Sequence, residues 1–183
     1  LKAQKLEDIE FICINDGSTD DSLHILQRYA QDDPRFTVID KPNSGYGASM
    51  NCGLDVARGE YIGIVESDDF ADAKMFQTLY KHASRNNCDI VKSNYYEYSG
   101  GGNVKQKPFA AFPYKNVFDP AEIVDVIKVL PVIWTAVYRR QMLEDNHIRF
   151  NETPGASFQD TSFVQRCWFA SKRAMLLPGA YLH

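Results

Sequence analysis

The sequence predicts an α/β protein of a single domain, in which a mostly parallel sheet is flanked by helices. The main observation is that short apolar runs alternate with helical patterns along the first half of the chain. The second is its size, because 183 residues with 44% hydrophobic and 24% charged residues can bury one sizeable core. Strand–helix–strand units of this kind build parallel sheets with right-handed crossovers.

The expected elements follow one another in chain order. Runs rich in Ile, Val and Tyr predict strands at residues 9–14, 36–39, 61–65 and 89–92. Apolar residues at helical spacing predict helices between them, at 22–31, 46–57 and 71–86. The second half is less regular, and we expect a loop over 100–113, a helix start at Asp119, a strand at 134–138 and helices at 141–146 and 158–171.

Charge and hydropathy exclude several classes of function. Twenty basic against 24 acidic residues give a net charge of −4, so we expect no nucleic-acid partner. The apolar runs fall short of the roughly 20 residues that a membrane span needs, and residues 1–8 do not resemble a signal peptide. A cytoplasmic location follows. Residues 1–8 look like the end of a helix, so we expect the fold's first strand to be missing.

Acidic residues follow two of the predicted strands. Asp16 comes after the first strand, and Glu66, Asp68 and Asp69 come after the third. Because the carboxyl ends of parallel strands meet at one edge of a sheet, these carboxylates can share a crevice. Clustered carboxylates need a cation, and oxygen ligands suit Mg²⁺ or Mn²⁺. Such a metal would in turn hold the phosphates of a nucleotide.

Another glycine pattern suggests a dinucleotide-binding site, but the match is poor. Gly45 and Gly47 precede a predicted helix, and Glu66 follows about 20 residues later. The third glycine position holds Met50, and the loop before Gly45 is too long for the tight turn of that motif. We therefore do not expect a nicotinamide-dependent dehydrogenase.

Several segments, taken in order, resemble family 2 glycosyltransferases of the bacterial polysaccharide type. The match runs from about residue 8 to residue 163, and no single segment carries it alone. Its pieces are Asn-Asp-Gly-Ser-Thr-Asp-Asp-Ser at 15–22, Asn-x-Gly at 43–45 and 51–53, Gly-Glu-Tyr-Ile at 59–62, Glu-Ser-Asp-Asp at 66–69, Trp-x-x-x-Tyr-Arg-Arg at 134–140 and Gln-Asp-x-x-Phe at 159–163.

The resemblance implies a GT-A fold across residues 1–183, with a nucleotide-sugar-binding part at 1–98 and an acceptor-side part at 99–183. It implies that the Asp-x-Asp-like segment binds Mn²⁺ or Mg²⁺, with Asp68 as the main ligand beside Glu66 and Asp69. It implies that Asp160 is the catalytic base. The residues expected to bind the donor nucleotide are Asp16, Gly17, Ser18, Asn43, Gly45, Asn51, Ser67 and Asp68.

Asp160 also has independent support from its position. It lies in the first turn of a predicted helix, where the helix dipole favours a charged carboxylate. It follows a Gly-Ala-Ser segment at 155–157, which we expect to frame an acceptor hydroxyl. The sequence departs from the family pattern next to it, because Gln159 stands where a glutamate is usual.

The implied activity is sugar transfer from a nucleotide sugar, with UDP as the expected nucleotide, to a glycan or lipid-linked acceptor hydroxyl. Inversion at the anomeric carbon follows, as does a place in cell-wall polysaccharide synthesis, with room for peripheral association at the inner membrane face. Two alternatives stay open from the sequence. One is a nucleotidyltransferase that makes sugar nucleotides, and the other is an inactive nucleotide- or glycan-binding relic, suggested by Gln159 and the missing first strand.

Overall fold

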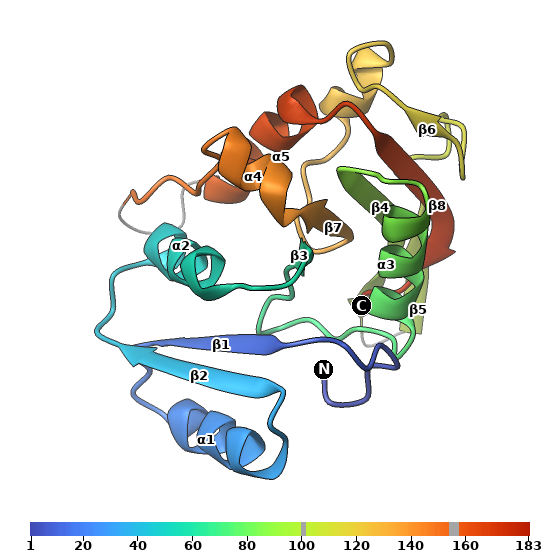
Figure 1. Ribbon diagram of the computed structural model, residues 1–183. Helices are drawn as coiled ribbons and strands as arrows, with labels where there is room; N and C mark the ends of the chain where they lie inside the picture. Colours follow the sequence, from blue (N-terminus) through green and yellow to red (C-terminus); the bar gives the residue numbers. More distant parts are fainter. Residues whose placement is uncertain (100–101, 154–157) are drawn as a thin grey trace.

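A computed structural model describes residues 1–99, 102–153 and 158–183 and shows the expected alternation in the first half (Figure 1). The elements there are β1 (Phe11–Asp16), α1 (Ser22–Asp32), β2 (Phe36–Lys41), α2 (Tyr46–Val56), β3 (Tyr61–Gly63), α3 (Met75–Arg85) and β4 (Ile90–Ser99). Residues 1–8 form an irregular segment rather than a helix end. Gln4 fixes this segment, because its side-chain amide donates to the carbonyl of Asp72 and accepts from the backbone N–H of Phe76.

The second half adds shorter elements that cover and extend the sheet. They are β5 (Gly102–Gln106), β6 (Val117–Phe118), a 3-10 helix (Val124–Lys128), β7 (Ala136–Arg139), α4 (Arg140–Asp145), α5 (Gln159–Ala170) and β8 (Ala174–Ala180). Part of the expected loop at 100–113 is therefore a strand, since β5 pairs antiparallel with β4. The expected helix start at Asp119 gives only a turn, in which the Asp119 carboxylate accepts from the backbone N–H of Ala121 at 2.9 Å.

The strands form two sheets. β1 and β2 pair in parallel, and the larger sheet has the order β3-β7-β4-β8-β6, with β5 against β4. β4 and β8 are parallel neighbours, and β3 runs in the same direction as both. The strands that the sequence predicts as parallel therefore share a direction within each sheet, β1 with β2 and β3 with β4, but they are divided between two sheets rather than joined in one. The antiparallel partners β5, β6 and β7 all come from the less regular second half.

Alternating side chains of the larger sheet divide the core into two layers. On β8, Ala174 and Leu176 join the cluster that contains the buried residues of α4 and α5, whereas Met175 and Leu177 join the cluster of α3. This is the period of two that a strand imposes on its two faces. Figure 1 shows α3 lying over β4 and β8, with α4 and α5 gathered beside α2.

The smaller sheet is covered less completely than the sequence predicts. Ile64 and Ile90 are buried as expected, and Leu54 and Ile62 pack against the same cluster. The expected core residues of β1 and β2 are only half-buried, namely Ile12, Ile14 and Val38. The reason is local, because α1 contributes no buried side chain to this sheet.

Every helix in the described part of the chain is too short or too polar to span a bilayer.

Candidate active site

Asp16 ends β1 and binds the loop that leads into α2. Its carboxylate accepts a hydrogen bond from the side-chain ammonium group of Lys41. It also accepts hydrogen bonds from the backbone N–H groups of Ser44, at 2.9 Å, and Gly45, at 3.0 Å. Partial burial acts to raise the pKa of Asp16, but the hydrogen bonds from Lys41 and Ser44 outweigh it, so the pKa lies below its ordinary value. Asp16 is therefore an ionised anchor that fixes the start of α2.

Two glycines allow these segments to approach one another. Gly17 and Gly45 have φ angles of 71° and 89°, in the region that favours glycine. A Cβ on Gly17 would lie 2.9 Å from the backbone nitrogen of Asn43, so the turn after β1 has no room for a side chain. The structure thus brings together four of the predicted donor residues, Asp16, Gly17, Asn43 and Gly45, with Ser18 exposed on the same turn.

Glu66 leads the acidic loop after β3 and is tied to the start of α2. Its Oε1 accepts the hydroxyl of Tyr46 at 2.6 Å. Burial raises the pKa of Glu66, and the charges of Asp68, Asp69 and Asp160 raise it further against the lowering effect of the Tyr46 hydrogen bond. Two consecutive residues at the start of α2 therefore bind these carboxylates. The backbone N–H of Gly45 donates a hydrogen bond to Asp16, and the hydroxyl of Tyr46 donates one to Glu66.

Asp68 and Asp69 lie further along the loop, toward solvent. Asp68 and the predicted donor residue Ser67 are exposed, whereas Asp69 is half-buried. Burial raises the pKa of Asp69, and the neighbouring charge of Asp68 adds to the effect. Crowded carboxylates of this kind favour a bound cation.

Asp160 reaches the same region from the other half of the chain. It lies in the first turn of α5 as the sequence predicts, and it follows Phe158, which has a φ of 54°. Its charge raises the pKa of Glu66 and that of Tyr46, for which burial is the larger cause, so the three side chains share one electrostatic environment. The expected acceptor-framing segment at 155–157 lies outside the described residues. Gln159 is buried, and its amide donates to the Thr153 hydroxyl at 3.0 Å.

Asn51 has a different environment from the other predicted donor residues. It is buried within α2, where its amide donates to the carbonyl of Phe150 at 3.0 Å and to Glu152 at 2.8 Å. Its amide oxygen accepts the backbone N–H of Phe150 at 2.9 Å. Because both ends of the amide bind the chain itself, Asn51 positions the segment that leads to α5.

The described side chains of the acidic loop do not by themselves complete a metal site. Among the described residues, no three His, Cys, Asp or Glu side chains are grouped so that they could hold an ion. Mg²⁺ and Mn²⁺ are commonly bound by one or two carboxylates together with substrate phosphates. The crowded acids of the loop fit that arrangement, with Asp68 and Asp69 free to face a ligand while Glu66 is held by Tyr46.

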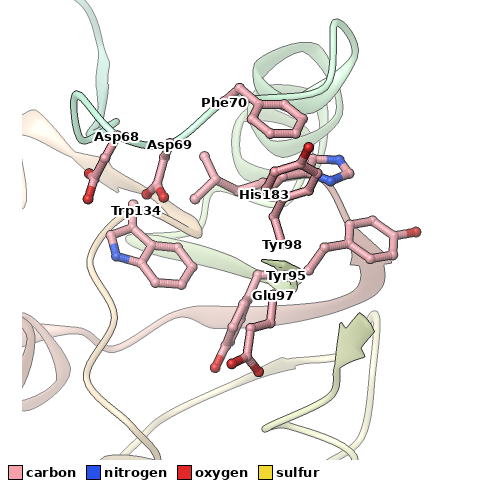
Figure 2. Close-up of a pocket in the computed structure, with 10 residues that line it drawn as sticks. Asp68, Asp69, Phe70, Tyr95, Glu97, Tyr98, Trp134 and His183 are labelled. Carbon is pink, nitrogen blue, oxygen red and sulfur yellow. The ribbon is translucent and has the colours of Figure 1, made fainter. Parts of the chain in front are cut away.

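A pocket of about 260 Å³ opens directly beside these acids (Figure 2). Asp68 and Asp69 form one wall, and aromatic side chains form much of the rest, among them Phe70, Tyr95, Trp134 and His183. The sequence identifies neither this pocket nor the roles of Tyr46 and Lys41. The pocket's aromatic residues come from four separate segments, so no local motif could have indicated them. The sequence places Tyr46 on a helix face but gives no sign of its partner Glu66, which lies 20 residues away.

Comparisons with known proteins agree on one family. The model of glycosyl transferase family 2 matches residues 1–161. The uncharacterized glycosyltransferase EpsJ of Bacillus subtilis is 32% identical over 100% of this chain and 54% of its own length. The cholesterol galactosyltransferase of Borreliella burgdorferi is 32% identical over 97% of this chain and 52% of its own. The chain thus spans about half the length of these curated relatives.

A solved structure extends the likeness to three dimensions. S. aureus TarS, crystallised with UDP, matches with a TM-score of 0.82 at 25% identity, over 98% of this chain and 52% of that chain. The same protein crystallised with UDP-GlcNAc matches with a TM-score of 0.81.

Proposed function

The chain belongs to glycosyl transferase family 2 and has a GT-A fold, and from this membership we propose that it carries the donor site and the base of a sugar-transfer enzyme. The donor is a nucleotide sugar, and we propose UDP as its nucleotide because TarS, 25% identical over nearly the whole chain, was crystallised with UDP. The acceptor is a hydroxyl of a glycan or of a lipid-linked saccharide.

The observation that carries the proposal is the double contact made at the start of α2. Gly45 binds Asp16, and Tyr46 binds Glu66, so consecutive residues join the carboxylate at the end of β1 to the one that follows β3. A nucleotide sugar needs two such groups side by side, because its nucleoside and its diphosphate are joined in one ligand. In this proposal Asp16 and the turn at Gly17 face the nucleoside, and the acidic loop faces the diphosphate.

Asp68 and Asp69 would hold a divalent metal together with that diphosphate. When bound, the metal supplies positive charge that stabilises the departing nucleoside diphosphate. Tyr46 keeps the half-buried Glu66 in place by a hydrogen bond of 2.6 Å.

Asp160 is proposed as the general base. Its carboxylate takes the proton of the acceptor hydroxyl while that oxygen attacks the anomeric carbon, and the bond to the diphosphate breaks on the opposite face. Inversion at the anomeric carbon follows. A positioned base of this kind contributes roughly 10²–10⁴ in rate.

The test is a calorimetric titration of the intact chain with UDP, with and without Mn²⁺. Binding that requires Mn²⁺ supports the donor site. A chain that binds no UDP under either condition would contradict it. UDP binding without any release of UDP from a nucleotide sugar would instead identify an inactive relic.

A further inference from the structure

Asp16 and Lys41 form a cross-strand pair at the carboxyl ends of β1 and β2. The parallel register places the two residues directly opposite one another. The side chain of Lys41 donates to Asp16 and, at 2.5 Å, to the hydroxyl of Ser44. Figure 1 shows the chain leading from the end of β2 into α2, whose start also binds Asp16. In open α/β sheets this edge is where ligands bind.

The pair lies on a face that a ligand can reach. Side chains alternate between the two faces of a strand, so Asn15 and Asp40 lie on the face opposite to Asp16 and Lys41. Asn15 is buried, and its amide donates to Asp40 at 2.7 Å. The side chains of Asp16 and Lys41, by contrast, are 24% and 17% exposed. A ligand at the end of this sheet therefore meets the carboxylate and the ammonium group together.

Both groups keep hydrogen-bonding capacity beyond their contacts within the chain. An ammonium group has three N–H donors, and Asp16 and Ser44 accept two of those of Lys41. The third has no partner within the part of the chain that the structure describes. An ionised carboxylate has about four acceptor positions, and hydrogen bonds from Lys41, Ser44 and Gly45 occupy three of those of Asp16. The pair thus presents a donor beside an acceptor.

A donor beside an acceptor is complementary to one class of nucleobase. Uracil and guanine, the keto bases, carry a ring N–H next to a carbonyl, so the N–H can donate to Asp16 while the carbonyl accepts from Lys41. Cytosine and adenine, the amino bases, carry the reverse pattern, an unprotonated ring nitrogen next to an amino group. They would leave the carboxylate unpaired and set two donors against one another, and both effects disfavour binding.

We propose that Lys41 is a specificity-determining residue that selects a keto base, by donating to the base carbonyl while Asp16 accepts from the adjacent ring N–H. The inference rests on the proposed function and deepens it, since it assigns a class of base to the donor nucleotide. Because Asp16 and Ser44 already hold the side chain of Lys41, little ordering cost remains when the base binds.

The first measurement needs no substitution. Calorimetric titrations of the intact chain with Mn²⁺ compare UDP, GDP, CDP and ADP, and then 4-thio-UDP and 6-thio-GDP, in which sulfur replaces the base carbonyl oxygen. A hydrogen bond to a charged group corresponds to roughly tenfold in affinity, so we expect UDP or GDP to bind about tenfold more tightly than CDP and ADP. Sulfur is a weak acceptor, so the thio analogue should bind several-fold more weakly than the nucleotide it replaces.

The second measurement repeats these titrations with Lys41→Met. Methionine nearly keeps the length of the side chain but cannot donate, so the keto nucleotide should lose about tenfold in affinity and bind no more tightly than CDP. Sulfur substitution should then have no further effect. Ser44→Ala removes one partner of the lysine but leaves its ammonium group, so the base preference should persist. Lys81→Met, an exposed lysine on α3, is the matched control and should change nothing.

An equal loss of affinity for all four nucleotides in Lys41→Met would overturn the inference, because Lys41 would then only support Asp16. Equal binding of keto and amino nucleotides by the parent would also overturn it. If Lys41→Met does not fold, the thio analogues decide, since equal binding of oxygen and sulfur forms by the parent excludes the carbonyl contact.

The proposed function fails separately. A parent that binds GDP in preference to UDP refutes UDP as the nucleotide and leaves the selection by Lys41 standing, whereas a parent that binds none of the nucleotides refutes both.

Discussion

The hydroxyl of Tyr46 donates a hydrogen bond of 2.6 Å to Oε1 of Glu66, and this bond joins the start of α2 to the acidic loop after β3. The neighbouring Gly45 binds Asp16 at 3.0 Å, so a single helix start connects the ends of two strands. The charge of Asp160, from α5, acts on both Tyr46 and Glu66. One predicted donor residue, Asp16, one predicted metal ligand, Glu66, and the predicted base thus lie around the start of α2.

Tyr46→Phe should weaken Mn²⁺-dependent UDP binding at neutral pH by about tenfold, because a hydrogen bond to a charged group is worth at least about 1.5 kcal/mol and each 1.4 kcal/mol is a factor of ten in affinity. The bond lowers the pKa of Glu66, so its loss should raise that pKa further and move the acid limit of UDP binding to higher pH. Calorimetric titrations across pH measure both effects. Tyr29→Phe, an exposed tyrosine on α1, serves as the control. An unchanged affinity and pH profile would show that the bond has no role in donor binding.

Asp68→Ala should abolish Mn²⁺-dependent UDP binding without loss of stability. Asp68 is exposed, and exposed substitutions usually change the free energy of unfolding by no more than about 0.5 kcal/mol. Glu122→Ala removes an exposed acid outside the site and should leave UDP binding as it is. Should Asp68→Ala bind UDP and Mn²⁺ as tightly as the parent, the metal assignment is wrong.

Asn51 and Asn43 should respond in opposite ways. Asn51→Ala leaves the buried backbone groups of Phe150 unpaired, so we expect a loss of about 2–3 kcal/mol in the free energy of unfolding. Asn43→Ala, in an exposed loop, should keep its stability but bind UDP more weakly. Denaturant unfolding and UDP titration of both variants separate the two roles, and equal behaviour of the two would refute the distinction.

Lys92 should make stability depend on pH. It is buried and donates to the carbonyl of Val132 at 2.5 Å, and burial lowers its pKa from 10.5 to about 7. Between these pH values the unfolded chain binds a proton that the folded chain does not, so stability should rise with pH by up to about 1.4 kcal/mol per unit.

Lys92→Met removes this titration. As pH rises from 7 to 10, the unfolding free energy of the parent should therefore increase relative to that of the variant. Chemical denaturation at several pH values measures it. A difference between variant and parent that stays constant over this range would show that Lys92 is charged within the fold.

Local pattern was sufficient to predict the first half of the fold. The alternation from β1 to β4 was predictable because each strand and helix carries its own hydrophobic period. No element was predicted for Ala174–Ala180, which forms β8; a proline and a glycine weaken its strand pattern, and its parallel pairing with β4 is a long-range contact. The short helix at Val124–Lys128 likewise depends on tertiary packing rather than on its Asp-Pro start.

The candidate site was predictable only where a motif carried it. Asp16, Glu66 and Asp160 follow from strand ends, turn residues and family resemblance, and the structure places them around the start of α2. The contact of Asn51 with Phe150 spans 99 residues, and the ring contact of Tyr95 with Trp134 joins β4 to the turn before β7. No local spacing in the sequence indicates such contacts, so they can be identified only from the three-dimensional structure.

The most direct test of the account is the release of UDP from UDP-glucose, UDP-galactose and UDP-N-acetylglucosamine, with Mn²⁺, by the parent and by Asp160→Asn. Asparagine keeps the shape of the side chain but cannot accept the proton. We expect the parent to release UDP from at least one donor and the variant to do so at least about 100-fold more slowly, with unchanged affinity for UDP. A variant that matches the parent in both rate and affinity would contradict the assignment of Asp160 as the base.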